Sequence, residues 1–186
     1  METVRAFLAL EVADEVKQNI MRLEDEVAGA GADVRLVSAE NLHITLKFLG
    51  DIEETMIEKV MGVMKAVRAD AFVLEVAGAG AFPGTRMPRV LWVGAGSGGE
   101  KISEISRQLE TGLTSLGFPK ERKFTPHITV GRVRSARGNA ALTGILQNNR
   151  DTRFGSTAID RIAFKKSVLT PSGPIYSGIG EVRLGQ

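Results

Sequence analysis

The chain contains no cysteine among its 186 residues, which excludes disulfide bonds, thiolate metal ligands and cysteine nucleophiles. It also lacks a large excess of charge, because its formal net charge is only +2. This balance does not suit a protein that covers a long nucleic acid duplex. No apolar run approaches the ~18 residues of a membrane span, and the N-terminus does not resemble a signal peptide. We therefore expect a cytoplasmic protein with no membrane segment.

Nucleotide-binding glycine motifs are missing as well. The stretch GAGSGGE, residues 94–100, is rich in glycine but lacks the lysine and the spacing of a phosphate-binding loop. No dinucleotide-binding fingerprint follows a predicted strand. The length fits one domain or two closely packed lobes, so we expect a single bilobal domain over residues 1–186.

The hydrophobic pattern predicts an α+β fold. Apolar alternation and apolar runs predict strands, whereas apolar residues at helical spacing predict helices. The predicted strands cover residues 3–10, 33–37, 42–49, 71–80, 89–95, 123–133, 158–169 and 174–184. The predicted helices cover 13–28, a segment capped by Asp51 that contains 57–67, a segment around 102–116, and 139–148. Strands outnumber helices in a mixed order, which favours largely antiparallel sheets.

Histidine occurs only twice, as His43 and His127, and each is followed by Ile and Thr. The two histidines are 84 residues apart, close to half the chain length. The repetition predicts two pseudo-symmetric lobes, each a mainly antiparallel sheet with helices packed outside. We expect each lobe to contribute one H-I-T strand to a cleft between them.

Alternation along a strand assigns a face to each residue of these motifs. Residues i and i+2 share a face, so His43 projects with Thr45, and His127 with Thr129. In the first motif strand, alternation places Lys47 with the histidine in the cleft. It directs the apolar residues to the core, namely Leu42, Ile44, Leu46 and Phe48.

Two facing H-x-T pairs suit acid–base chemistry at phosphorus. Histidine exchanges protons near neutral pH, so one imidazole can accept a proton from a nucleophile while the other donates one to a leaving group. Threonine hydroxyls can bind phosphoryl oxygens. A zinc site is the competing interpretation, but zinc needs three or four protein ligands, and neither Glu40 nor Asp51 shares the His43 face. We expect no metal and no cofactor.

NLHITLKFLG (41–50) and KFTPHITVGRV (123–133) resemble the two signature strands of the 2H phosphoesterases. The resemblance is to the bacterial and archaeal group called RNA 2′,3′-cyclic phosphodiesterase or 2′-5′ RNA ligase, and it covers nearly the whole chain. It implies metal-independent hydrolysis of RNA 2′,3′-cyclic phosphate ends to 2′-phosphate ends. It also implies that His43 is the proton donor, His127 the proton acceptor, and Thr45, Thr129 and Arg132 the phosphate-binding residues.

Arg132 conflicts with strict alternation, which puts it on the same face as Ile128 and Val130. Either a bulge at Gly131 turns the side chain into the cleft, or Arg132 acts from the end of the strand. Phe7, Phe48 and Tyr176 are aromatic residues that could stack on a terminal base, although each also fits the core.

Basic residues cluster at KERK (120–123), at Arg132, Arg134 and Arg137, and at Arg86 and Arg89; each cluster fits either a solvated surface or a phosphate site. Two other functions stay open from the sequence. The protein could join RNA by 2′-5′ ligation, since the same acid and base run the reaction both ways, or it could bind RNA ends without catalysis. A monomer is expected in each case.

Overall fold

The computed structural model describes residues 2–185, which form four α-helices and nine strands. The strands are β1 (Thr3–Glu11), β2 (Val34–Leu36), β3 (His43–Glu53), β4 (Phe72–Phe82), β5 (Val90–Ala95), β6 (His127–Val133), β7 (Arg153–Ile159), β8 (Arg161–Thr170) and β9 (Gly173–Arg183). The helices are α1 (Asp14–Gly29), α2 (Ile57–Ala66), α3 (Gly99–Ser115) and α4 (Asn139–Asn148).

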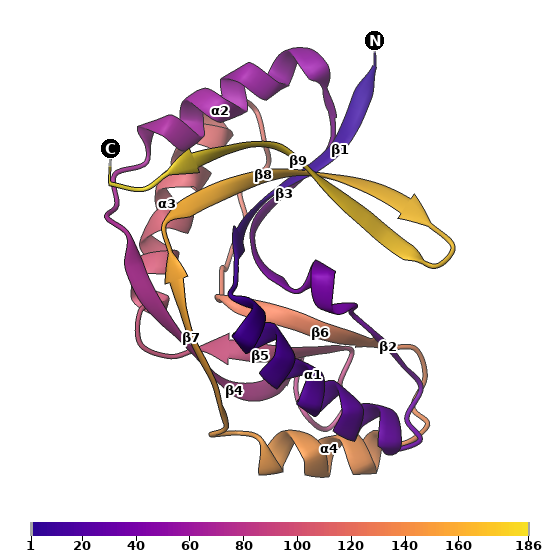
Figure 1. The fold of residues 1–186 in the computed structure, drawn as a ribbon. Coiled ribbons are helices and arrows are strands. Elements are labelled where there is room, and N and C mark those ends of the chain that lie inside the picture. Colours follow the sequence, from indigo (N-terminus) through magenta and orange to yellow (C-terminus); the bar gives the residue numbers. More distant parts are fainter. Residues whose placement is uncertain (1, 186) are drawn as a thin grey trace.

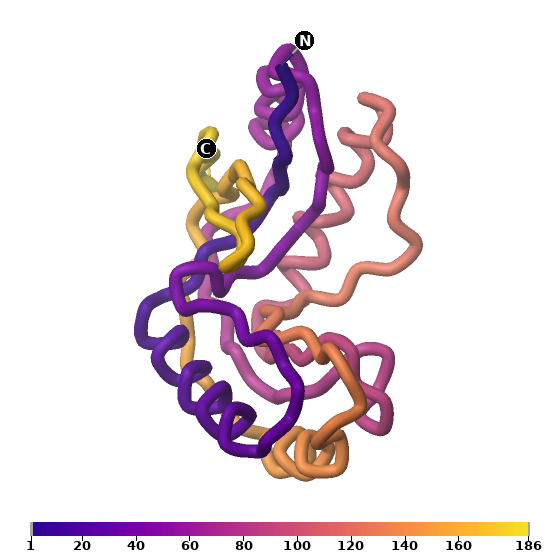
Figure 2. Tube along the Cα trace, turned by 90° about the vertical axis from the view of Figure 1, so that its right-hand side faces the viewer, coloured from indigo at the N-terminus to yellow at the C-terminus, as the bar shows by residue number. Residues whose placement is uncertain are grey.

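The strands pair antiparallel in the order β7-β4-β5-β6-β3-β1-β8-β9, with β2 also paired to β6. Figures 1 and 2 show two lobes. The lower lobe of Figure 1 holds β2, β4, β5, β6 and β7 with α1 and α4, and the upper lobe holds β1, β3, β8 and β9 with α2 and α3. The lobes meet where β3 pairs with β6 through Ile44 and Ile128. The α+β fold with two similar lobes is therefore as predicted.

The helices pack their predicted apolar faces against the sheet. In α1 the buried side chains include Val16, Ile20, Leu23 and Val27, and in α3 they include Ile102, Ile105, Leu109 and Leu113. Each large aliphatic side chain contributes about 1.5–3 kcal/mol when it is fully buried. Of these two helices, α1 packs against β7, β2 and β6 of the lower lobe, and α3 packs against β3 of the upper lobe.

Two predicted boundaries are wrong. Asp51 does not cap α2, because β3 continues to Glu53 in antiparallel pairing with β1, and Asp51 lies opposite Arg5 within that pairing. The predicted strand 158–169 is instead the end of β7 and most of β8. The chain changes lobes at Asp160, since β7 pairs with β4 whereas β8 pairs with β1.

Each motif strand carries a β-bulge directly after its threonine. In β3, Leu8 pairs with Lys47 and Ala9 with Thr45, which leaves Leu46 as an extra residue. In β6, Leu91 pairs with Gly131 and Trp92 with Thr129, which leaves Val130 as the extra residue. A bulge shifts the side chains that follow it to the opposite face. In β3 this applies to Lys47 and Phe48, because a second bulge follows at Leu49.

These bulges overturn two predicted orientations and explain a third. Lys47, predicted in the cleft, is only 4% exposed, and its ammonium group lies 3.0 Å from the carboxylate of Glu110 in α3. Phe48, predicted in the core, is 63% exposed. Arg132 is turned to the cleft as a bulge predicts, although the extra residue is one position earlier than Gly131.

Candidate active site

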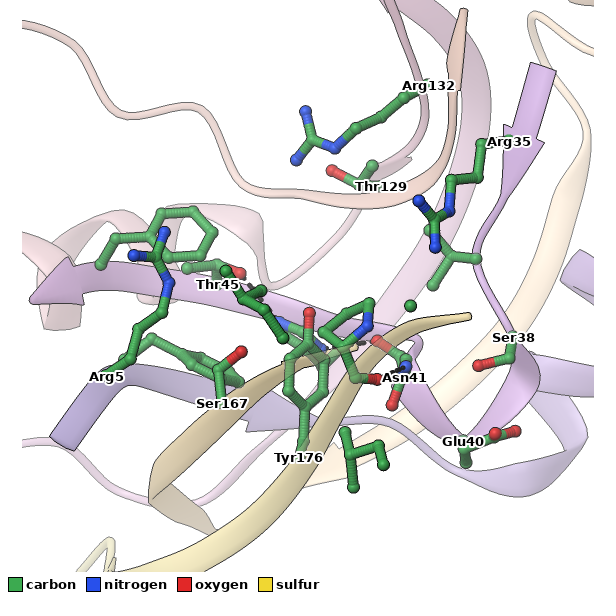
Figure 3. A pocket seen from close by; sticks show the side chains of 18 of the residues that line it. Arg5, Arg35, Ser38, Glu40, Asn41, Thr45, Thr129, Arg132, Ser167 and Tyr176 are labelled. Carbon is green, nitrogen blue, oxygen red and sulfur yellow. Dashed lines mark hydrogen bonds between the residues drawn. The ribbon is translucent and has the colours of Figure 1, made fainter. Parts of the chain in front are cut away.

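Both H-I-T motifs line one cleft of about 650 Å³ at the junction of the lobes. All five predicted site residues border it: His43, Thr45, His127, Thr129 and Arg132. Figure 3 shows part of this cleft, with Thr129 and Arg132 above and Thr45 and Tyr176 at the centre. The pairing of Ile44 with Ile128 brings the two motifs together, because it places their flanking polar residues on neighbouring strands.

His43 is fixed by contacts on every side. Its Nδ1 donates to the backbone carbonyl of Asn41 at 2.7 Å, and since a carbonyl only accepts, this bond assigns the hydrogen to Nδ1. Nε2 then accepts a hydrogen bond from the Thr45 hydroxyl at 2.9 Å. The ring stacks on Phe7 with centroids 5.0 Å apart and meets the edge of Tyr176 at 5.4 Å.

This environment disfavours the charged imidazole. Burial lowers the pKa of His43 from its ordinary 6.5 to about 4, and the positive charges of Lys165 and Lys17 also lower it. The hydrogen bond to Asn41 and the charge of Glu11 act in the opposite direction. In the free protein at neutral pH, His43 is therefore neutral and its Nε2 carries a lone pair.

His127 has the same tautomer in a more open setting. Its Nδ1 donates to the backbone carbonyl of Thr125 at 2.7 Å, which leaves Nε2 as the nitrogen available to a bound molecule. The rings of Phe82 and His127 are nearly perpendicular, with their centroids 5.0 Å apart. The two imidazoles thus offer equivalent nitrogen atoms to one cleft, but only His43 is enclosed by two aromatic rings.

Arg132 supplies positive charge to the centre of the cleft. Figure 3 shows its guanidinium directed over Thr129. Burial raises the pKa of the Tyr176 hydroxyl, and the positive charge of Arg132 lowers it in part. With two threonine hydroxyls below it, this cation can hold the oxygens of a phosphate group.

The sequence did not predict several residues that line the cleft, among them Arg5, Arg35, Asn41 and Ser167. Asn41 opens the first signature strand but was not predicted to line the cleft, whereas Arg5, Arg35 and Ser167 lie in strands where no motif was predicted, and the pairing of strands brings them to the site. Of the three aromatic candidates, Phe48 is exposed in the cleft, whereas Phe7 is buried beneath His43.

Of the predicted basic clusters, only Arg132 borders the cleft. None of the residues 120–123, Arg134, Arg137, Arg86 or Arg89 borders the cleft. Arg134 forms a salt bridge with Asp33, and Glu121 lies 3.5 Å from the ammonium group of Lys47. Within residues 2–185, no group of three His, Asp or Glu side chains is arranged to hold a metal ion. No helix in that range combines the length and apolar character needed to cross a membrane.

A family model for LigT-like phosphoesterases matches the chain twice, over residues 10–92 and 93–176. The chain belongs to this family. The two matches divide the chain between the two H-I-T motifs, so each repeat of the family unit carries one histidine. The predicted family is confirmed.

Curated relatives match over nearly their whole length. The RNA 2′,3′-cyclic phosphodiesterase of Methanothermobacter thermautotrophicus is 36% identical over 183 residues, which cover 97% of this chain and 99% of the relative. The protein of the same name from Aeropyrum pernix is 38% identical over 165 residues, covering 88% and 94%. The crystal structure of E. coli LigT in complex with 3′-AMP has the same fold, with a TM-score of 0.82, 22% identity and full coverage of both chains.

Proposed function

We propose that the protein hydrolyses the 2′,3′-cyclic phosphate ends of RNA to 2′-phosphate ends without a metal ion. The observation that carries this proposal is the meeting of the two H-I-T strands, which gives one cleft two imidazoles with matching tautomers. The names of the relatives from M. thermautotrophicus and A. pernix support the same substrate class. Because one chain supplies both motifs, a monomer suffices, and we expect it to act in the cytoplasm.

In the proposed reaction His127 is the proton acceptor and His43 the proton donor. Nε2 of His127 removes a proton from water as the water oxygen attacks phosphorus. The bond from phosphorus to the ribose 3′-oxygen breaks, and that oxygen takes the proton from Nε2 of His43. Thr45, Thr129 and Arg132 hold the other phosphate oxygens and stabilise the charge that grows on them. Solvent then restores the proton on His43 and removes the one on His127.

The donor role requires that His43 become protonated when substrate binds. Its low pKa in the free protein arises chiefly from burial, and an anionic phosphate in the cleft favours the imidazolium. Thr45 fits both states, since its hydroxyl can donate to the neutral Nε2 and accept from the protonated one. Binding of the anionic phosphate thus favours protonation of His43, which the proposed reaction requires.

The test uses His43→Ala and His127→Ala with two substrates. On an oligonucleotide with a 2′,3′-cyclic phosphate end, each variant should lose at least ~10²-fold in rate, and EDTA should leave the parent protein active. A phosphodiester with a p-nitrophenolate leaving group needs no proton donor, because p-nitrophenolate departs as an anion. On this substrate His43→Ala should regain activity, whereas His127→Ala should stay inactive. Full activity of either variant on the RNA would refute the proposal, and a 3′-phosphate product would reverse which oxygen leaves.

Joining of RNA by a 2′-5′ bond is the second candidate. It is favoured by the same pair of imidazoles, because the acid of one direction is the base of the other. Incubating the protein with RNA halves, one ending in a 2′,3′-cyclic phosphate and the other in a 5′-hydroxyl, and mapping any new linkage would test it. A protein that bound the cyclic end without turnover would instead be a non-catalytic RNA-end binder.

A further inference from the structure

Two arginines stand side by side at one end of the cleft. Arg35 in β2 is the direct antiparallel partner of Arg132 in β6, and both side chains are exposed and line the cleft. Directly opposite residues have Cβ atoms about 4.5–5.5 Å apart, where like charges destabilise the sheet. Within residues 2–185, neither guanidinium has a carboxylate within salt-bridge distance. An anionic ligand would relieve this repulsion.

The guanidinium groups of Arg132 and Arg35 occupy different parts of the cleft. Figure 3 shows the Arg132 guanidinium above Thr129, whereas the Arg35 guanidinium lies apart from it and extends toward the side of the cleft that holds Asn41. Arg35 leans on the turn between β8 and β9, since a Cβ built on Gly173 would lie 3.3 Å from its Nη2. One phosphate group held at Thr129 and Arg132 therefore leaves Arg35 free for a second anion.

The segment that follows β2, the strand of Arg35, leads directly into the first H-I-T motif. A short 3-10 helix, Ala39–Asn41, connects β2 to β3. The side-chain amide of Asn41 donates to the backbone carbonyl of Pro174 at 2.9 Å, and the backbone carbonyl of Asn41 accepts from Nδ1 of His43. Glu40 also borders this end of the cleft, but Figure 3 shows its carboxylate directed away from Arg35. The backbone that carries Arg35 is thus joined to the H-I-T strand β3 through a short segment held by hydrogen bonds.

We propose that Arg35 binds the phosphodiester group that precedes the terminal nucleotide of an RNA. The cleft then selects the end of an RNA chain over a free nucleoside 2′,3′-cyclic phosphate, because only the chain has this second phosphate. This inference rests on the proposed function for the nature of the substrate. Arg132 serves the terminal phosphate, and Arg35 the next one.

The experiment compares two substrates, adenosine 2′,3′-cyclic phosphate and a diadenosine with the same cyclic end. The parent protein should have the higher kcat/KM for the dinucleotide. Arg35→Gln should lower the ratio of the two kcat/KM values about tenfold or more, as expected for a charge-assisted bond to phosphate. It should also reduce by about 1 the slope of log affinity against log salt for the dinucleotide. Arg132→Gln should lower both rates and keep the ratio.

Arg89→Gln is the matched control, because Arg89 is an exposed arginine of the same lobe that does not border the cleft. It should change neither rate. Binding of the corresponding 2′-phosphate ligands, measured by calorimetry, gives a second ratio that does not depend on turnover. If the parent protein hydrolysed neither substrate, the proposed function would fail while the binding ratio still decided the role of Arg35. An Arg35→Gln variant with unchanged ratios, or with equal losses on both ligands, would overturn the inference.

Discussion

The protonation of His43 should change strongly when a phosphate enters the cleft. Burial holds its pKa at about 4 in the free protein instead of 6.5, which corresponds to about 3 kcal/mol against the charged form. A phosphate charge ~4 Å away contributes roughly 4 kcal/mol in the opposite direction at an effective dielectric constant of 20. That energy corresponds to about 3 pH units. We therefore expect a nucleoside 2′-phosphate to raise the pKa of His43 to about 7.

Proton NMR can measure this directly, because the chain has only two histidines and hence two sets of imidazole signals. A His127→Asn variant assigns them. The His43 signals should titrate with a midpoint of about 4 in the free protein. With saturating nucleoside 2′-phosphate the midpoint should rise to about 7. A midpoint near 6.5 without ligand would refute the claim that burial lowers the pKa of His43. A midpoint that stayed the same when ligand was added would favour His43 as the proton acceptor.

Three further variants test other parts of the structure. Phe48→Ala should weaken binding of the dinucleotide by about 1–3 kcal/mol if its exposed ring stacks on a base, with little change in thermal stability; unchanged binding would exclude stacking. Lys47→Ala leaves the Glu110 carboxylate without its ammonium partner and should lower the free energy of unfolding by about 3–5 kcal/mol at unchanged kcat/KM, whereas lost activity in a variant of unchanged stability would show that Lys47 acts at the active site. Burial raises the pKa of Glu24 from 4.5 to about 8, so the folded state holds this proton more tightly and stability falls as pH rises through that range. Glu24→Gln should therefore stabilise the protein at pH ~8 and much less at pH ~5, as denaturant unfolding would measure; an equal effect at both pH values would contradict the assignment.

The sequence alone was sufficient to predict the features that depend on residues close together in the chain. Apolar residues at helical spacing located α1 and α3, because each helix must bury one stripe against the sheet. The repeated tripeptide located both catalytic candidates, since strand alternation alone separates the core-facing Ile44 and Ile128 from their polar neighbours. The α+β class followed from the number and order of these elements.

The errors come from features that depend on distant partners. The bulge after Thr45 is defined by the register of β1 against β3, so alternation within β3 alone put Lys47 and Phe48 on the wrong faces. The break at Asp160 marks a change of pairing partner and leaves no local signal. The neighbours Arg35 and Arg132 are 97 positions apart in the chain, and only the pairing of β2 with β6 brings them together.

The equivalent bulges have a consequence for how the two repeats diverged. They turn the fifth residue after each histidine into the cleft, and this residue is Phe48 in one repeat and Arg132 in the other. Two copies of one unit placed around an axis would otherwise build a cleft with two equal halves. The end of an RNA is itself unequal, with a flat base on one side and a charged phosphate on the other. This position, a ring in one repeat and a cation in the other, adds to the difference between the enclosed His43 and the more open His127 and makes the two halves of the cleft unequal. We therefore expect such an end to bind in one direction.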